Sequence, residues 1–337
     1  MTGSRVIFRV EPERNEDVFG YLARVASRNQ LGNIHTVLSE VLGVKQAEIT
    51  TADAAPLAHF CRLHLDEMLS LSGVSRKTCY GARTWQVCGQ WVSKEPFVAT
   101  RRARVCPACL RDAAYIRGEW MLSFYTSCIH HSTALVGHCP CCKKSIRWNR
   151  HLARYCACGG DLAITDGAPA SPHGLMVSEL IGWQSGYDIQ LRPYPGIGIL
   201  EHEQLARLSL DGLCKTMWFL GHCLGELGRY SVGHGRIKPM SADADAIVLK
   251  ALQAIEDWPR RFGELLNTAQ HPASSARAGT LIERLLGPVH KYFLQEMQDE
   301  ELSFVRIAYE QHVHDIWRRL GRRRQTNDRQ LELDFDP

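Results

Sequence analysis

The sequence predicts a mainly α protein with an N-terminal helix-turn-helix region, central tandem zinc fingers and a C-terminal helical domain. Apolar residues recur with a period near 3.6 over much of the chain, which is typical of amphipathic helices. Eight cysteines fall within the 53 residues from Cys106 to Cys158. We find no strand-rich segment and no repeat of fixed period. The expected domains are an N-terminal helical domain (1–100), a zinc-finger domain (101–165), a linker (166–175), a C-terminal helical domain (176–320) and a charged tail (321–337).

The composition is that of an ordinary globular protein. The 337 residues are 45% hydrophobic and 23% charged, which allows two or three domains with a sizeable core. The formal net charge of +4 permits nucleic-acid contact without demanding it. No stretch approaches the roughly 18 apolar residues of a membrane span, and the first residues lack the apolar core of a signal peptide. We therefore expect a soluble, cytoplasmic protein with no membrane partner.

The N-terminal region carries two segments typical of helix-turn-helix units. In 36–50, an apolar helical stripe meets a tight turn at Gly43 and is followed by further apolar residues. Segment 65–81 repeats this pattern, and its second half carries Arg76 and Lys77. At a helix N-terminus these two side chains could contact phosphates. A plain helical hairpin remains an alternative interpretation of both segments.

The central cysteines form regular couples with one histidine. The couples are Cys106/Cys109, Cys128/His131, Cys139/Cys142 and Cys156/Cys158. Zinc takes four thiolate or imidazole ligands in a tetrahedron, and a two-residue gap lets one tight turn present two of them. Eight ligands therefore predict two closed sites, one CCCH-type and one CCCC-type, holding two structural Zn²⁺ ions. Each such site supplies on the order of 10 kcal/mol of folding free energy.

Other arrangements of these residues stay open. The four couples could pair sequentially, which we favour, or interleave as a cross-brace, and one zinc or none are weaker alternatives. Disulfides would require an oxidising compartment, and a redox C-x2-C motif expects a βαβ context. We interpret Cys141 as a bystander and His130 and His138 as neighbours of the sites. The scattered cysteines are expected to be small buried residues; they are Cys61, Cys79, Cys88, Cys214 and Cys223.

Basic residues cluster beside the zinc couples and near the C-terminus. They fit nucleic-acid phosphates, an acidic protein surface or a solvated face. Together with the N-terminal pair, these candidate nucleic-acid or partner-binding residues are Arg101, Arg102, Arg104, Lys143, Lys144, Arg147, Arg318, Arg319, Arg322, Arg323 and Arg324. The chain closes on 331–337, where acidic and apolar residues alternate. This end could dock as a peptide on another subunit, or stay unstructured.

The zinc segment resembles the TniQ family, the target-selection proteins of transposons. The shared zinc-segment features are Cys-Pro-x-Cys-Leu at 106–110, Trp120, Cys128-x2-His131 followed by Leu135, Cys139-Pro140-x-Cys142 and Cys156-x-Cys158-Gly159. Similar stretches outside it lie around Tyr21, Leu22, Arg24 and Ala26, and at Trp258-Pro259. These features are spread over nearly the whole chain. One departure is Glu16-Asp17-Val18, where the family often has Glu-Ser-Leu.

The resemblance implies an adaptor of transposition and no enzyme. Such proteins link a chosen target to an AAA+ ATPase regulator, which in turn brings the transposase. Some bind a specific DNA site, and others sit on a CRISPR effector complex such as Cascade, commonly as a head-to-tail homodimer. The alternative function is a sequence-specific helix-turn-helix and zinc-finger DNA-binding protein that recognises an attachment site. The sequence also lacks a Walker lysine loop and a nucleophile elbow.

Overall fold

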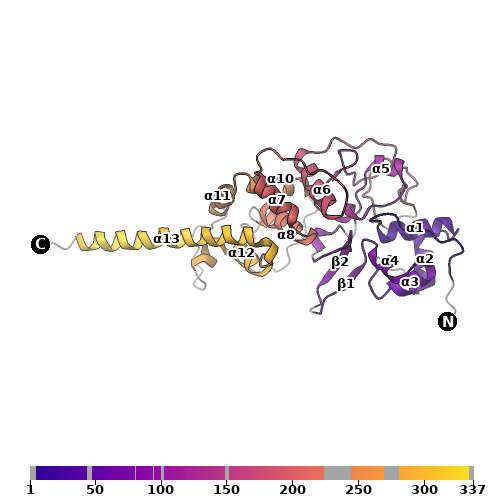
Figure 1. The fold of residues 1–337 in the computed structure, drawn as a ribbon, viewed down its shortest axis with the longest axis horizontal. Coiled ribbons are helices and arrows are strands. Elements are labelled where there is room, and N and C mark those ends of the chain that lie inside the picture. Colours follow the sequence, from indigo (N-terminus) through magenta and orange to yellow (C-terminus); the bar gives the residue numbers. More distant parts are fainter. Residues whose placement is uncertain are drawn as a thin grey trace. The chain divides into compact units, whose positions relative to one another are not determined.

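The computed structural model divides the chain into two compact units. The first unit comprises Met1–Tyr194, Ser209–Cys214 and Lys238–Leu249; the second comprises Pro195–Leu208, Lys215–Ile237 and Lys250–Pro337. The structure describes residues 5–43, 48–79, 81–93, 95–99, 102–148, 152–223, 244–268 and 281–333. Figure 1 shows the labelled helices and strands.

The first unit combines short helices with two small antiparallel sheets. Its helices are α1 (Val18–Arg28), α2 (Ile34–Leu42), α3 (Ala54–Cys61), α4 (Leu65–Ser70), α5 (Pro107–Asp112) and α6 (Pro172–Gln184), with 3-10 turns η1 (Glu95–Phe97) and η2 (Gly118–Met121). Its strands are β1 (Ser75–Lys77), β2 (Arg83–Val87) and β3 (Gln90–Val92) in one sheet, and β4 (Ser127–Cys128) and β5 (Thr133–Ala134) in the other.

The second unit is helical in its described residues. Its helices are α7 (Ile199–Arg207), η3 (Phe219–Cys223), α11 (Arg260–Thr268), α12 (Leu281–Glu296), η5 (Glu300–Leu302) and α13 (Ser303–Leu333). Two further helices, α8 (Leu210–Trp218) and α10 (Ala244–Ile255), each have residues in both units. The prediction of a mainly helical chain with a helical C-terminal region is thus confirmed.

Helix α1 shows how the sequence forms the core of the first unit. The side chain of Asp17 caps the helix by accepting a hydrogen bond from the backbone N–H of Gly20, at 2.9 Å. The buried face then carries large apolar residues such as Leu22 and Val25, both fully buried. Asp17 is part of the departure from the TniQ resemblance noted in the sequence, where serine is frequent, and both residue types cap helices well.

The predicted helix-turn-helix units are not confirmed. Helix α2 does end at Gly43, which has the positive φ of 69° that closes helices, but 44–47 lie outside the described residues. The unit predicted in 65–81 is wrong in its second half. Helix α4 ends at Ser70, and the chain then forms strand β1 instead of a helix.

The sheet β1-β2-β3 was missed because its strands are only three to five residues long. The register joins Ser75 to Trp85 and Trp85 to Val92. Between β2 and β3, Cys88 and Gly89 both take positive φ angles, of 48° and 84°, as the tightest hairpin turns require. Arg76 and Lys77 therefore lie on a strand, where both are exposed, and not at the start of a helix.

The segment 166–175, predicted as a linker, is part of the first unit, and its backbone hydrogen-bonds to residues 132–134. Ala134 N–H donates to the carbonyl of Ala168 at 2.8 Å, and Ala170 N–H donates to the carbonyl of Ser132 at 3.0 Å. Ser171 then caps α6. These bonds add 168–170 to the edge of the β4–β5 hairpin.

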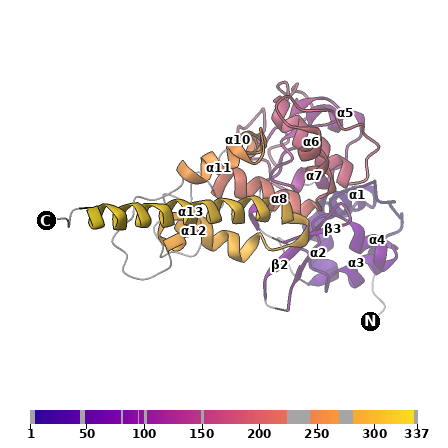
Figure 2. The same ribbon diagram turned by 60° about the vertical axis from the view of Figure 1, so that its left-hand side comes forward.

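Aromatic side chains form the core of the second unit. The rings of Phe293 in α12 and Tyr309 in α13 stack with centroids 3.9 Å apart, and Phe219 stacks on Tyr292 at 5.9 Å. Helices α12 and α13 run side by side in both views (Figures 1 and 2). Residues 321–333 of the predicted charged tail continue α13, while 334–337 lie outside the described residues. Among the described helices, none combines the length and apolar character that a membrane crossing needs.

Candidate metal centres

The eight predicted ligands meet in two clusters within the described residues. The first centre consists of Cys106, Cys109, Cys128 and His131, and the second of Cys139, Cys142, Cys156 and Cys158. In each centre the candidate ligand atoms all lie within 4.8 Å of one another. The grouping follows the sequential pairing of the couples rather than the interleaved one.

The spacing of atoms in the first centre suits tetrahedral zinc. The Cys109 Sγ atom lies 3.5 Å from Cys128 Sγ and 3.3 Å from His131 Nδ1, and Cys106 Sγ lies 3.6 Å from the same nitrogen. With Zn–S bonds of about 2.3 Å and Zn–N bonds of about 2.0 Å, ligand atoms at tetrahedral angles stand roughly 3.5–3.8 Å apart. The donor set and its geometry therefore fit a closed CCCH site.

Helix α5 prepares the first couple of ligands. Cys106 is its N-cap, Pro107 occupies the first turn, and Cys109 N–H donates to Cys106 Sγ at 3.5 Å. The side chains of Cys109 and Cys128 hydrogen-bond to Cys106, which holds the pKa of its thiol well below the ordinary range. The contact with Cys106 in turn raises the pKa of the Cys109 and Cys128 thiols. The case for a metal site therefore rests on the geometry of the four ligand atoms.

A second layer of side chains orients the first centre. The Nε2 atom of His131 lies 2.9 Å from a carboxylate oxygen of Asp112, at the end of α5. A carboxylate on the far ring nitrogen leaves Nδ1 free to bind metal and fixes the ring. The hydroxyl of Thr133 lies 3.7 Å from Cys106 Sγ. The sequence analysis missed both residues; Asp112 could have been suspected only as an acid near the ligands.

The second centre is built from two backbone turns. Cys139 Sγ lies 3.7 Å from Cys158 Sγ, and Cys142 Sγ lies 3.9 Å from Cys156 Sγ. Lys143 N–H donates to the carbonyl of Cys139, which closes the first turn. These sulfur separations again match the edges of a tetrahedral zinc site, here of the CCCC type.

The second turn of this centre depends on Gly160. A Cβ atom at this position would stand 2.7 Å from Cys141 Cβ and 3.3 Å from Cys158 Sγ, which is too close for a side chain. The backbone N–H of Gly160 also lowers the pKa of the Cys158 thiol to about 6. Cys141 itself is exposed and stands outside the cluster of four.

The predicted basic residues next to the centres have different surroundings. Arg104 has a structural role, because its guanidinium donates hydrogen bonds to the backbone carbonyls of Leu122 and Ser123 at 2.7 and 2.9 Å. Burial lowers its pKa to about 10. The other described ones are exposed; they are Arg102, Lys143, Lys144 and Arg147. Arg101 lies outside the described residues.

The remaining basic candidates lie far from the centres in sequence. Arg76 and Lys77 are exposed on β1, and Arg318 and Arg319 are exposed on α13. The side chains of Arg322, Arg323 and Arg324 lie outside the described residues, although α13 includes their backbone. Arg76 and Lys77 thus belong to the first unit, and Arg318 and Arg319 to the second.

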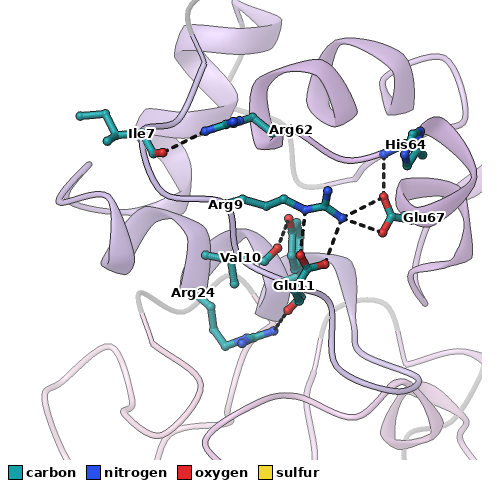
Figure 3. A network of polar contacts seen from close by, with 9 residues as sticks. Ile7, Arg9, Val10, Glu11, Arg24, Arg62, His64 and Glu67 are labelled. Carbon is teal, nitrogen blue, oxygen red and sulfur yellow. Dashed lines mark hydrogen bonds and ion pairs between the residues drawn. The ribbon is translucent and has the colours of Figure 1, made fainter.

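The N-terminal signature residues tie an extended segment to the helices of the first unit. Arg24 in α1 binds the buried carboxylate of Glu16 at 2.7 Å and donates to the carbonyl of Glu11. Arg9 binds Glu67 of α4 at 3.1 Å, and Figure 3 shows this contact together with the one between Arg24 and Glu11. Burial raises the pKa of Glu16 although Arg24 opposes this shift. These signature residues therefore have a structural role.

Two comparisons with known proteins gave different results. A search of curated proteins found no match. The family model described as TniQ matches residues 7–135, a segment that holds the N-terminal signature and the whole first centre but none of the second. This match confirms the resemblance seen in the sequence: residues 7–135 of the 337 are similar to the TniQ family model.

Proposed function

We propose that the protein is a non-catalytic target-selection adaptor of DNA transposition. It links a target-recognition complex, either a CRISPR effector such as Cascade or target DNA, to an AAA+ ATPase regulator and through it to the transposase. The TniQ match over residues 7–135 is the observation that carries this proposal. We place the protein in the cytoplasm. We also propose a homodimer, which would present two copies of each contact surface.

The two centres support a role in holding structure. Each offers four protein ligands, and a site closed by four ligands leaves no position for a reacting water. We propose that each binds one structural Zn²⁺, so metal analysis of the purified protein should give two zinc ions per chain. Chelation should unfold segments that have little other core.

The adaptor role is tested by reconstitution. The zinc-loaded chain is mixed with a candidate AAA+ regulator and a candidate target-recognition complex, and the assemblies are separated by size-exclusion chromatography. We expect regulator and recognition complex to co-elute only when the chain is present. Failure of the regulator to associate with the chain under any condition would overturn the proposal.

The second candidate is a sequence-specific DNA-binding protein that recognises an attachment site. The exposed Arg76 and Lys77 on β1 favour it. In this case one duplex should bind about 10³-fold or more tightly than random sequence. The adaptor docked on an effector complex should instead bind free DNA weakly, with a steep salt dependence.

A further inference from the structure

The β1–β2 hairpin carries exposed positive charge on both faces of a small antiparallel sheet, because neighbouring residues of a strand point to opposite faces. Arg76 and Lys77 on β1 and Arg83 on β2 are all exposed. The register places Arg76 opposite Thr84 and Lys77 opposite Arg83. We call these three residues the cationic hairpin; Figure 1 shows β1 and β2 as neighbouring strands.

Two like charges face each other across this hairpin. Directly opposed like charges destabilise an antiparallel pair, so the arrangement needs compensation. Arg83 obtains it from Glu48 at 2.9 Å, and the other oxygen of Glu48 accepts a hydrogen bond from the Ser75 hydroxyl at 2.6 Å. Lys77 has no acidic partner among the described residues. Its charge is therefore available to an anion from outside the fold.

The neighbouring arginine is held in place by an aromatic ring. The guanidinium of Arg76 lies 3.8 Å from the ring centroid of Trp91 on β3, and its Nε atom lies 3.4 Å from the Thr84 hydroxyl. A stacked guanidinium keeps its charge and its outer N–H donors. Because the side chain is already ordered, little conformational entropy is lost when these donors bind.

We propose that the cationic hairpin binds the phosphate backbone of duplex DNA. Lys77 supplies an unpaired point charge on one face of the edge strand β1, and Arg76 supplies, on the other face, a fork of donors whose position Trp91 fixes. Such contacts position a protein on DNA without reading its sequence. The choice of DNA as the polyanion rests on the proposed role in transposition.

The test measures binding of the full-length, zinc-loaded chain to a fluorescently labelled random duplex over a salt series. Each phosphate contact contributes about 0.9 to the slope of log affinity against log salt, so Arg76→Gln/Lys77→Gln should lower the slope by about 1.8. We expect a loss of affinity of roughly tenfold or more at low salt. Trp91→Leu should weaken binding less and leave the Lys77 part of the slope intact.

The matched control removes one arginine and one lysine elsewhere. Arg207→Gln/Lys291→Gln changes two exposed residues of the second unit and should bind DNA like the wild type. Zinc content and the thermal unfolding midpoint of every variant establish that the fold is kept. Wild-type affinity and slope in the hairpin variant would overturn the proposal, as would absence of duplex binding by the wild type. A hairpin-dependent affinity for polyglutamate without one for DNA would also overturn it.

The hairpin variant also separates this proposal from the adaptor role. Recruitment of the AAA+ regulator should be unchanged in Arg76→Gln/Lys77→Gln. If the wild type binds duplex DNA through the hairpin but recruits no regulator, the adaptor role fails while the hairpin assignment stands.

Discussion

The two metal centres use the same chemistry in different surroundings. In the first centre all three cysteines are at most 1% exposed, whereas in the second Cys158 is exposed and Cys142 and Cys156 are partly so. The first has a helix cap, a carboxylate behind its histidine and a hydroxyl beside a sulfur. The second has backbone turns and Gly160. An ion in the first centre would therefore join elements of the core, and an ion in the second would order a surface loop.

The largest expected effect is the loss of a ligand from the first centre. Cys128 lies on β4, so Cys128→Ala should release one zinc and unfold the middle of the chain, since such a site contributes on the order of 10 kcal/mol. Zinc stoichiometry and limited proteolysis measure both losses. Cys79→Ala, an exposed cysteine outside both clusters, is the control. A well-folded Cys128→Ala protein with two zincs would exclude Cys128 as a ligand.

A ligand change in the second centre should act more locally. Cys158→Ala should lose one zinc while the first centre keeps its ion and most of the unfolding transition is preserved. Hydrogen exchange should show faster exchange confined to 139–160. The neighbouring Cys141→Ala should keep two zincs. If Cys158→Ala unfolds the chain as extensively as Cys128→Ala, the contrast between the centres is wrong.

The second layer of the first centre should have a smaller effect. Asp112→Asn removes the carboxylate charge on His131 and should weaken zinc binding there by about 10- to 100-fold. Competition with a chromophoric chelator measures this change. Asp166→Asn, which alters an exposed partner of Arg111, is the matched control. Equal zinc affinity in both variants would mean that Asp112 does not support the histidine.

The smallest effect is expected at the tight turn of the second centre. Gly160→Ala places a methyl group against Cys141 and two ligand sulfurs and should cost on the order of 1 kcal/mol, seen as faster zinc release to a chelator. Adding Cys141→Gly removes the nearest clash and should restore part of the loss. No rescue in the double variant would show that the sulfurs, and not Cys141, set the limit.

Much of the metal chemistry could be predicted from the sequence because it depends on local spacing. The couples sit on single turns, so residues such as Cys139 and Cys142 reveal themselves by their two-residue gap. The supporting residues could not be predicted in the same way. Asp112 contacts His131 only after α5 and the β4–β5 hairpin have come together, and nothing in its neighbourhood of the sequence distinguishes it from other surface acids.

The same holds for the fold: elements set by neighbouring residues could be predicted from the sequence, and those set by residues far away in the chain could not. Helix α1 follows from its apolar period and its cap at Asp17. Strand β1 does not, because three residues are too few for alternation to stand out and Arg76 and Lys77 are equally suited to a helix. The proline- and glycine-rich stretch 166–175 suggested a free connection, yet its backbone pairs with residues 132–134, about 35 positions earlier in the chain.

That pairing has a practical meaning for anyone who wishes to excise the TniQ domain. The family match ends at residue 135, but the hairpin that carries Cys128 continues its hydrogen bonding to Ala168 and Ala170. A piece cut at 135 would expose Ser132 and Ala134 as an open sheet edge and invite self-association. The smallest sensible piece runs on through α6, so it must include the second metal centre as well as the first.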